Sequence, residues 1–188
     1  MNNTFQQFDA VIKICKDIFS KKMLDYSSSW RVMRNSSIVD QIFIKAQRIR
    51  TIDDKGTQKV EEDIRLDYIS IVNYSIIGLI QSELSNDKRT DIPLDEASIM
   101  FDKFSVQAKS LMEKKNHDYG EAWRDMRISS FTDLILMKLF RIRQIEDNKG
   151  CTIISEGIDS NYYDTINYAI FALIKIDEAK MKMTSHKN

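Results

Sequence analysis

The chain has 188 residues, 43% of them hydrophobic, and its 28 basic and 28 acidic residues give a formal net charge of zero. A chain of this length can bury a hydrophobic core, but without net charge it creates no overall field to attract a nucleic-acid backbone or an anionic membrane surface. No apolar stretch has the length of a membrane span. Cys15 and Cys151 fit neither a disulfide framework nor a zinc site. We therefore expect a cytoplasmic protein with no membrane partner and no direct binding of nucleic acid.

Helix-forming residues dominate the composition, and only five Gly and one Pro are available for turns. These features predict an all-α fold. In chain order, the apolar periodicity predicts helices over residues 5–24, 36–51, 60–82, 95–117, 129–147 and 156–182. The single proline, Pro93, lies in a polar stretch that we interpret as a linker, and Thr90 or Asp91 is expected to cap the helix that follows.

Two segments of the chain are closely similar. The sequence KKMLDYSSSWRVMR at 21–34 returns as KKNHDYGEAWRDMR at 114–127, and sixteen of the thirty positions from 21 to 50 are identical after a shift of 93 residues. One residue is then inserted, after which Glu62 matches Glu156 and Asn73 matches Asn167. We predict a helical bundle built from two tandem copies of a roughly three-helix unit. The predicted parts are a first repeat at 1–84, a linker at 85–95 and a second repeat at 96–188, packed as one globular unit.

Glycines mark the turns within the repeats. Gly120 follows the first helix of the second repeat, where we expect a left-handed conformation that its counterpart Ser27 would adopt less readily. Gly56 and Gly150 are expected just past the second helix of each repeat.

The repeated loop carries aromatic residues with two interpretations. Trp30 and Trp123, with Tyr26 and Tyr119, could stack on a nucleotide base or could anchor the loop in the core. Asp118 in the same loop could supply a ligand or cap the following turn.

Other polar residues recur at equivalent helical positions. Asp40 and Asp133 are expected to cap a helix or to pair with the nearby Arg34 and Arg127. Asn167, like its counterpart in the first repeat, places an amide within an apolar run, so its side chain needs hydrogen-bond partners if it is buried.

Acidic residues gather at the start of the last predicted helix. At about 100° of rotation per residue, Glu156 and Asp159 fall on one stripe with Asp164 at its edge. Carboxylates brought together repel one another unless a cation neutralises them, and Mg²⁺ prefers oxygen ligands of this kind. The first repeat has Arg65 and Ser70 in place of Asp159 and Asp164, so only the second repeat could hold the same metal.

Lys138 and Arg141 form a cationic pair on the preceding predicted helix and suit phosphate oxygens. A metal site beside a phosphate clamp would be a nucleotide site. A structural alternative stays open, in which Glu156 and Asp159 are first-turn acids favoured by the helix dipole and Lys138 and Arg141 pair with them across helices.

Three motifs in the second repeat resemble one known family. They are KxxDYG (Lys115, Asp118, Tyr119, Gly120), KxxRI (Lys138, Arg141, Ile142) and the pair EGID and DTINYAI (Glu156, Asp159, Asp164, Asn167). Together they resemble the nucleotide modification associated domain 1 family, which looks like a relative of the MazG-like all-α nucleoside triphosphate pyrophosphatases. The resemblance covers residues 108–174, and residues 15–80 form a more divergent copy.

The resemblance implies that the protein binds a nucleotide and hydrolyses a nucleoside triphosphate to the monophosphate and pyrophosphate with Mg²⁺ or Mn²⁺. Carried over to this chain, the metal and catalytic set is Glu156, Asp159 and Asp164. The substrate-binding set is Lys115, Asp118, Tyr119, Lys138, Arg141 and Asn167. The first repeat would then be a degenerate copy that supports the second.

Three functions remain open at this point. The protein could be a pyrophosphatase, a non-catalytic module of a nucleotide modification system that binds a nucleotide or a protein, or a helical domain whose polar residues serve only its structure. MazG-like domains need a partner to complete their bundle; the fused copy would supply one, and a homodimer is a further expectation.

Overall fold

The computed structural model describes residues 3–154 and 156–185, and it is built from helices, with no strand in that part of the chain. The α-helices are α1 (Asn3–Tyr26), α2 (Asn35–Lys55), α3 (Ile64–Glu83), α4 (Leu94–Tyr119), α5 (Ile128–Asp147) and α6 (Ile158–Ser185). Short 3-10 helices, η1 (Ser29–Val32) and η2 (Ala122–Asp125), follow α1 and α4. The predicted all-α bundle is confirmed. No helix within the described ranges combines the length and the apolar character that crossing a membrane requires.

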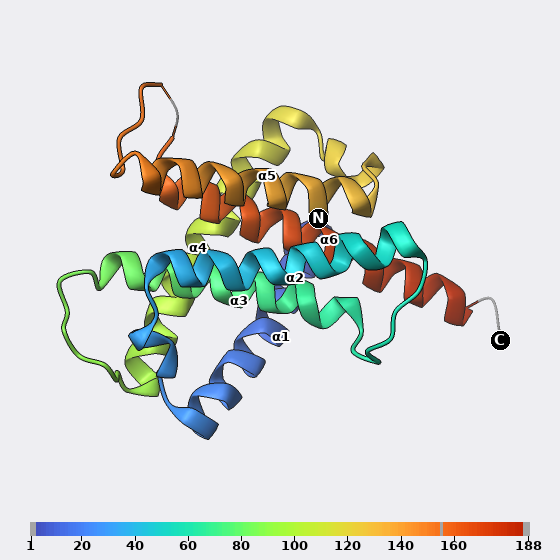
Figure 1. The fold of residues 1–188 in the computed structure, drawn as a ribbon. Coiled ribbons are helices and arrows are strands. Elements are labelled where there is room, and N and C mark those ends of the chain that lie inside the picture. Colours follow the sequence, from blue (N-terminus) through green and yellow to red (C-terminus); the bar gives the residue numbers. More distant parts are fainter. Residues whose placement is uncertain (1–2, 155, 186–188) are drawn as a thin grey trace.

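The helices form three layers, each made of one helix from each repeat. The central layer is α3 beside α6, which pack against each other over their lengths (Figure 1). Helices α2 and α5 contact each other and cover one face of this pair, while α1 and α4 contact each other and cross the opposite face. Equivalent helices of the two repeats therefore meet in every layer.

Reciprocal ion pairs show how the repeats are related. Arg143 pairs with Asp40 at 2.7 Å, and Arg50 lies 3.6 Å from Asp133. Arg50 and Arg143 are equivalent residues, as are the two aspartates, so each repeat gives the same arginine to the other repeat's aspartate. This is the pattern of a twofold interface. Our prediction that Asp40 and Asp133 cap a helix or pair with Arg34 and Arg127 was wrong, because both aspartates lie inside their helices and the layer α2–α5 brings each of them to an arginine of the other repeat.

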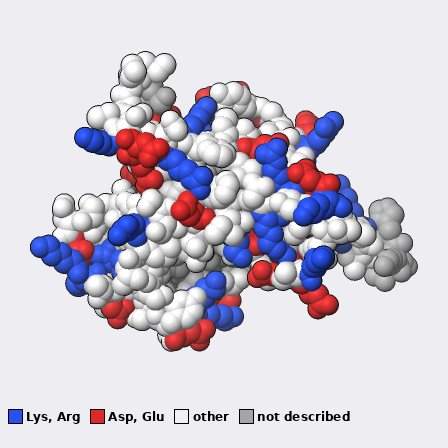
Figure 2. All heavy atoms as spheres, viewed as in Figure 1, with Lys and Arg blue, Asp and Glu red and all other residues white. Residues whose placement is uncertain are grey.

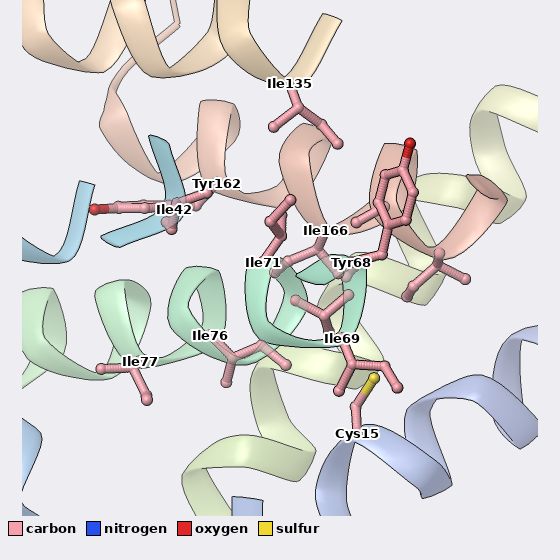
Figure 3. Close-up of a cluster of buried hydrophobic side chains, with 14 of the residues drawn as sticks. Cys15, Ile42, Tyr68, Ile69, Ile71, Ile76, Ile77, Ile135, Tyr162 and Ile166 are labelled. Atoms are coloured by element: carbon pink, nitrogen blue, oxygen red, sulfur yellow. The ribbon is translucent and has the colours of Figure 1, made fainter. Parts of the chain in front are cut away.

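The central position of α3 and α6 follows from their composition. Thirteen of the 20 residues of α3 are buried, and the run Ile166–Leu173 in α6 is buried except at Tyr168. Figure 3 shows α3 side chains meeting Ile166 and Tyr162 of α6, Ile42 of α2 and Cys15 of α1. A helix that is apolar on most of its circumference needs neighbours on both sides, and the three-layer arrangement supplies them.

The two repeats approach each other closely at Gly78 on α3. A Cβ atom built on Gly78 would lie 2.6 Å from Cζ of Tyr162, so the phenol ring occupies the space of a side chain. The Tyr162 hydroxyl is buried without a hydrogen-bond partner in the described structure, whereas the equivalent Tyr68 bonds the Thr132 hydroxyl at 2.7 Å. Val39, at the position equivalent to Thr132, offers no hydroxyl. The two halves of the interface are therefore similar but not identical.

The turns after α1 and α4 have the same backbone form but different support. Gly120 has φ +61°, as predicted, and Ser27 also adopts a left-handed φ of +57°. Asp91 accepts hydrogen bonds from the Ser27 and Ser28 hydroxyls at 2.5 and 2.6 Å, and these bonds lower the pKa of Asp91 to about 2. The prediction that Asp91 caps α4 was therefore wrong, because its carboxylate holds the Ser27 turn instead.

The ends of the other helices differ in part from the predictions. Gly56 is the left-handed residue just past α2, as expected, but α5 ends at Asp147, two residues before Lys149 and three before Gly150. Helix α6 begins at Ile158, so Glu156 precedes the helix and lies outside the predicted stripe. Asp159 is the acidic residue of the first turn.

Replacing Gly78 with alanine tests the close contact between the repeats. Alanine favours a helix by about 1 kcal/mol over glycine, yet the added methyl group would overlap the Tyr162 ring. We expect Gly78→Ala to lower the free energy of unfolding by about 1 kcal/mol or more, measured by urea denaturation. In a Tyr162→Leu background the same substitution should be neutral or stabilising. An equal loss in both backgrounds would contradict the proposed contact.

Candidate functional site

Asp164 lies at the centre of an ion-pair cluster on α6. Its side chain is 6% exposed, and its two oxygens are held by Lys115 of α4 at 2.5 Å and by Lys138 of α5 at 2.6 Å. The Lys138 side chain is 10% exposed, so this ion pair is shielded from water. The structure thus brings together three residues of the predicted site, and it does so as two cations around one anion.

The charges of this cluster support one another. Burial lowers the pKa of Lys115, but the hydrogen bond and the charge of Asp164 outweigh it, so the pKa of Lys115 lies above its ordinary value. Lys115 therefore stays charged at neutral pH. Both Asp164 oxygens are already engaged with ammonium groups, so a metal bound by this carboxylate would have to lie beside two cations.

The other two predicted metal ligands lie apart from this cluster. Glu156 and Asp159 are exposed, Glu156 before α6 and Asp159 in its first turn. Among residues 3–154 and 156–185, no three His, Cys, Asp or Glu side chains are placed to hold a metal ion together. The described arrangement therefore does not fit a three-carboxylate Mg²⁺ site, and the role of these acids in metal binding stays a prediction.

The first repeat has its buried acid three residues earlier on the equivalent helix. Asp67 of α3 is fully buried; Arg48 of α2 is bonded to it, and Lys45 lies 3.2 Å away. Arg48 also donates to the Glu62 carbonyl oxygen at 2.9 Å, which ties the segment before α3 to α2. Lys45 and Arg48 are therefore neutralised within the first repeat.

Asn161 stands in the second repeat where Asp67 stands in the first. Because an amide carries no charge, Arg141, the counterpart of Arg48, loses its acidic partner. Within the described part of the chain Arg141 has no hydrogen bond or ion pair, and it is exposed. The second repeat thus keeps both cations of the pair but leaves Arg141 available.

Arg141 lines a pocket with a volume of about 790 Å³. It is bounded by α5, by the start of α6 and by the segment between them, which projects from the bundle in Figure 1. Its polar lining comprises Lys138, Arg141, Gln144, Asn148, Thr152, Glu156 and Asn161. Its apolar lining comprises Met137, Phe140, Ile145, Cys151, Ile153 and Ile154. The sequence interpretation had identified Lys138, Arg141 and Glu156, and the pocket brings them together.

The lining contains both cationic and apolar side chains. Phe140 is 53% exposed, and Ile153 and Ile154 are almost fully exposed, an arrangement that costs free energy unless a ligand or partner covers these side chains. The predictions missed Asn161, whose signal was its replacement of an aspartate between otherwise similar repeats. The predictions also missed Ile153 and Ile154, because neither residue belongs to a recognisable sequence motif.

The remaining predicted residues lie outside this pocket. Trp123 is 6% exposed and stacks on Phe171 at 4.2 Å, so it anchors the loop in the core. Asn167 donates to the Ala108 carbonyl oxygen at 3.1 Å and ties α6 to α4. Tyr119 and Asp118 are exposed at the end of α4.

Charge is evenly distributed on the face of the molecule shown in Figure 2. Lys and Arg side chains alternate with Asp and Glu, and neither sign covers a continuous area there. An anionic ligand would therefore be recognised by local groups such as Arg141 and not by a general field.

Replacing Asp164 with asparagine tests whether this acid serves the structure. The change would leave the buried Lys138 without its counter-ion, and removal of one partner of a buried pair costs about 3 kcal/mol. We expect such a loss in denaturant unfolding, whereas Asp159→Asn on the exposed first turn should change stability by less than about 0.5 kcal/mol. Equal effects of the two substitutions would show that the cluster does not stabilise the fold.

The sequence pattern of one family matches the chain twice. It is described as nucleotide modification associated domain 1, and the matched residues, 22–82 and 115–176, fall one in each repeat and together make up more than half of the chain. No curated protein and no solved structure matches the chain. The two matches confirm the tandem copies predicted from the internal repeat. The chain therefore belongs to the nucleotide modification associated domain 1 family and carries two copies of its domain.

Proposed function

We propose that the protein binds a nucleoside phosphate in the pocket of the second repeat. The observation that carries this proposal is Arg141, which has no ion pair among the described residues and lies beside Lys138 in a pocket of about 790 Å³. Pockets that bind small ligands have volumes of roughly 300–1,000 Å³, so a whole nucleotide fits. Membership of a family associated with nucleotide modification agrees with this ligand class.

The cationic side chains of the lining suit the phosphates of a nucleotide, and the apolar side chains suit its base. The planar guanidinium of Arg141 can donate two parallel hydrogen bonds to phosphate oxygens. Lys138 adds a fixed positive charge, because Asp164 holds its ammonium group in place. Phe140 and the isoleucines at 153 and 154 offer apolar surface to a base, which would bury side chains that are otherwise exposed.

A second candidate function is hydrolysis of a nucleoside triphosphate to the monophosphate and pyrophosphate. Glu156 favours it, because this carboxylate lines the same pocket as the two cations. Glu156 would take a proton from a water molecule that attacks the α-phosphorus. The bond from that phosphorus to the bridging oxygen would break, and Arg141 and Lys138 would stabilise the charge on the departing pyrophosphate. This is the reaction that the resemblance to MazG-like enzymes implies.

A metal ion takes no step in this scheme, because the three predicted ligands do not form a group in the described structure. A divalent ion would instead arrive with the triphosphate and add to the neutralisation of its charge. Dependence of activity on Mg²⁺ or Mn²⁺ is therefore an outcome to be measured.

Alkylation of Cys151 offers a direct measure of nucleotide binding. Cys151 is exposed in the pocket, while Cys15 is buried with its pKa raised to about 12, so a thiol reagent should label only Cys151 in the folded protein. We expect a nucleoside triphosphate to slow this labelling. Arg141→Ala should weaken the protection about 10-fold or more, because a hydrogen bond to a charged group contributes about 1.5–3 kcal/mol.

Lys114→Ala is the control, since it removes one positive charge from an exposed position of α4 outside the pocket lining. It should leave protection of Cys151 within about 2-fold, because a charge at the protein surface is largely screened. Equal losses in both variants, or no protection of the native protein by any nucleotide, would count against the binding site.

Glu156→Gln separates the two candidate functions. With a panel of ribo- and deoxynucleoside triphosphates and Mg²⁺, Mn²⁺ or no metal, we expect the native protein to release pyrophosphate. The variant should lose at least about 100-fold of this rate, since a general base contributes about 10²–10⁴-fold, while nucleotide still protects Cys151. Protection without release in the native protein would leave the binding function and remove the hydrolase.

A further inference from the structure

The two repeats differ in charge at one position of their third helices. Asp67 of α3 is fully buried and pairs with Arg48 and Lys45 of α2. Its counterpart on α6 is Asn161, which is 4% exposed and lines the same pocket of about 790 Å³ as Arg141. The two side chains have nearly the same size, but a carboxylate is a charged acceptor, whereas an amide is neutral.

In the first repeat the protein itself engages the arginine of the second helix. Arg48 donates to an Asp67 oxygen, to the Glu62 carbonyl oxygen at 2.9 Å and to the Val60 carbonyl oxygen at 3.4 Å. One carboxylate and two main-chain carbonyl groups therefore surround its guanidinium group. The same bonds hold the segment before α3 against α2.

In the second repeat none of these acceptors engages the equivalent arginine. The carbonyl groups that correspond to those of Val60 and Glu62 belong to Ile154 and Glu156. Within the described ranges of the chain, Arg141 makes a hydrogen bond to neither of them, and it is exposed. A guanidinium group with five N–H donors thus lines the pocket without an acceptor from the protein.

The amide of Asn161 bonds to the segment before its own helix. Its Nδ2 donates to the Gly157 carbonyl oxygen at 2.9 Å, which fixes the end of the amide that acts as the donor. Asn161 therefore brings neither a negative charge nor an ion pair to Arg141.

The lysine of the first helix shows the opposite difference between the repeats. Lys22 has no ion pair or hydrogen bond among the described residues, and it lines a small pocket of about 120 Å³ between α1, η1 and α3. Its counterpart Lys115 pairs with Asp164, which Ser70 replaces in the first repeat. In each repeat, the cation that lacks an acid lines a pocket.

We propose that Asn161 determines the ligand specificity of the second repeat. Because Asn161 withholds a carboxylate from Arg141, a phosphate group of the ligand supplies the oxygens that Asp67 and two carbonyl groups supply to Arg48. This inference rests on the function proposed above. It adds the residue that makes the pocket selective for an anion and the part of the ligand that binds to Arg141.

The number of acceptors around Arg48 favours a phosphate group over a carboxylate as the ligand of Arg141. Three oxygens accept hydrogen bonds from Arg48, and a terminal phosphate group carries three strong acceptor oxygens, whereas a carboxylate carries two. The planar guanidinium group also matches the geometry of phosphate oxygens. The terminal phosphate of a nucleotide is therefore the group that we expect at Arg141.

Isothermal titration calorimetry with inorganic pyrophosphate as the probe compares the native protein, Asn161→Asp and Asn161→Ala. Both substitutions remove the bond to Gly157, but only the aspartate adds a charge. We expect Asn161→Asp to bind pyrophosphate at least about 10-fold more weakly than Asn161→Ala does, because the new carboxylate takes the charged hydrogen bonds of Arg141 from the ligand. Acetate should bind the native protein at least about 10-fold more weakly than pyrophosphate does.

Urea denaturation without ligand tests the same contact independently of binding. Asn161→Asp should unfold at a higher urea concentration than Asn161→Ala, because its carboxylate gains Arg141 as a partner. In an Arg141→Ala background this advantage should disappear, since a buried carboxylate would be left without a counter-ion.

The outcomes separate this inference from the proposed function. Pyrophosphate binding that is as tight in Asn161→Asp as in Asn161→Ala overturns the role of Asn161, as does an advantage of Asn161→Asp in urea that is unchanged without Arg141. Acetate binding as tight as that of pyrophosphate overturns the choice of a phosphate. If nucleotide protects Cys151 but the native protein does not bind pyrophosphate, the inference fails and the proposed function stands. If neither is observed, both fail.

Discussion

A carboxylate buried on the third helix of each repeat, and the cations that surround it, determine which surfaces of this protein are open. In the first repeat the acid is Asp67, which pairs with Lys45 and Arg48 of α2. In the second it is Asp164, whose equivalent position in the first repeat, Ser70, lies three residues after Asp67. Three residues are nearly one helical turn, so the two acids lie on the same face of the helix at different heights.

That displacement explains why the pockets of the two repeats are at different places. In the first repeat Asp67 pairs with Arg48 of the second helix, and Lys22 of the first helix has no ion pair among the described residues. In the second repeat Asp164 pairs with Lys115 of the first helix, and Arg141 of the second helix lines the pocket with no acidic partner among the described residues. A buried charge must have a partner. A shift of the buried carboxylate by one turn along the third helix therefore changes which cation is left without an acid: the lysine of the first helix or the arginine of the second helix.

The internal repeat made the helices predictable, because the same pattern of apolar residues occurs in both copies and indicates the same three helices in each. The central position of the third helices followed from their apolar composition in the same way. The ion pairs were not predictable. Helical rotation places Asp164 at the edge of a stripe, but only the crossing of α4, α5 and α6 decides that two lysines reach it. Asp67 stands close to an exposed acidic run in sequence, and no local pattern marks it as buried.

The Gly78–Tyr162 contact and the reciprocal arginine–aspartate pairs make the two repeats an interface within one polypeptide. In an assembly of identical chains, each substitution appears on both sides, so a change that opens one pocket opens its symmetry mate as well. Tandem fusion removes this coupling. It also holds the two repeats at a high effective concentration. Two different repeats made as separate chains would form identical as well as mixed dimers, whereas the fused repeats stay paired with each other at any dilution.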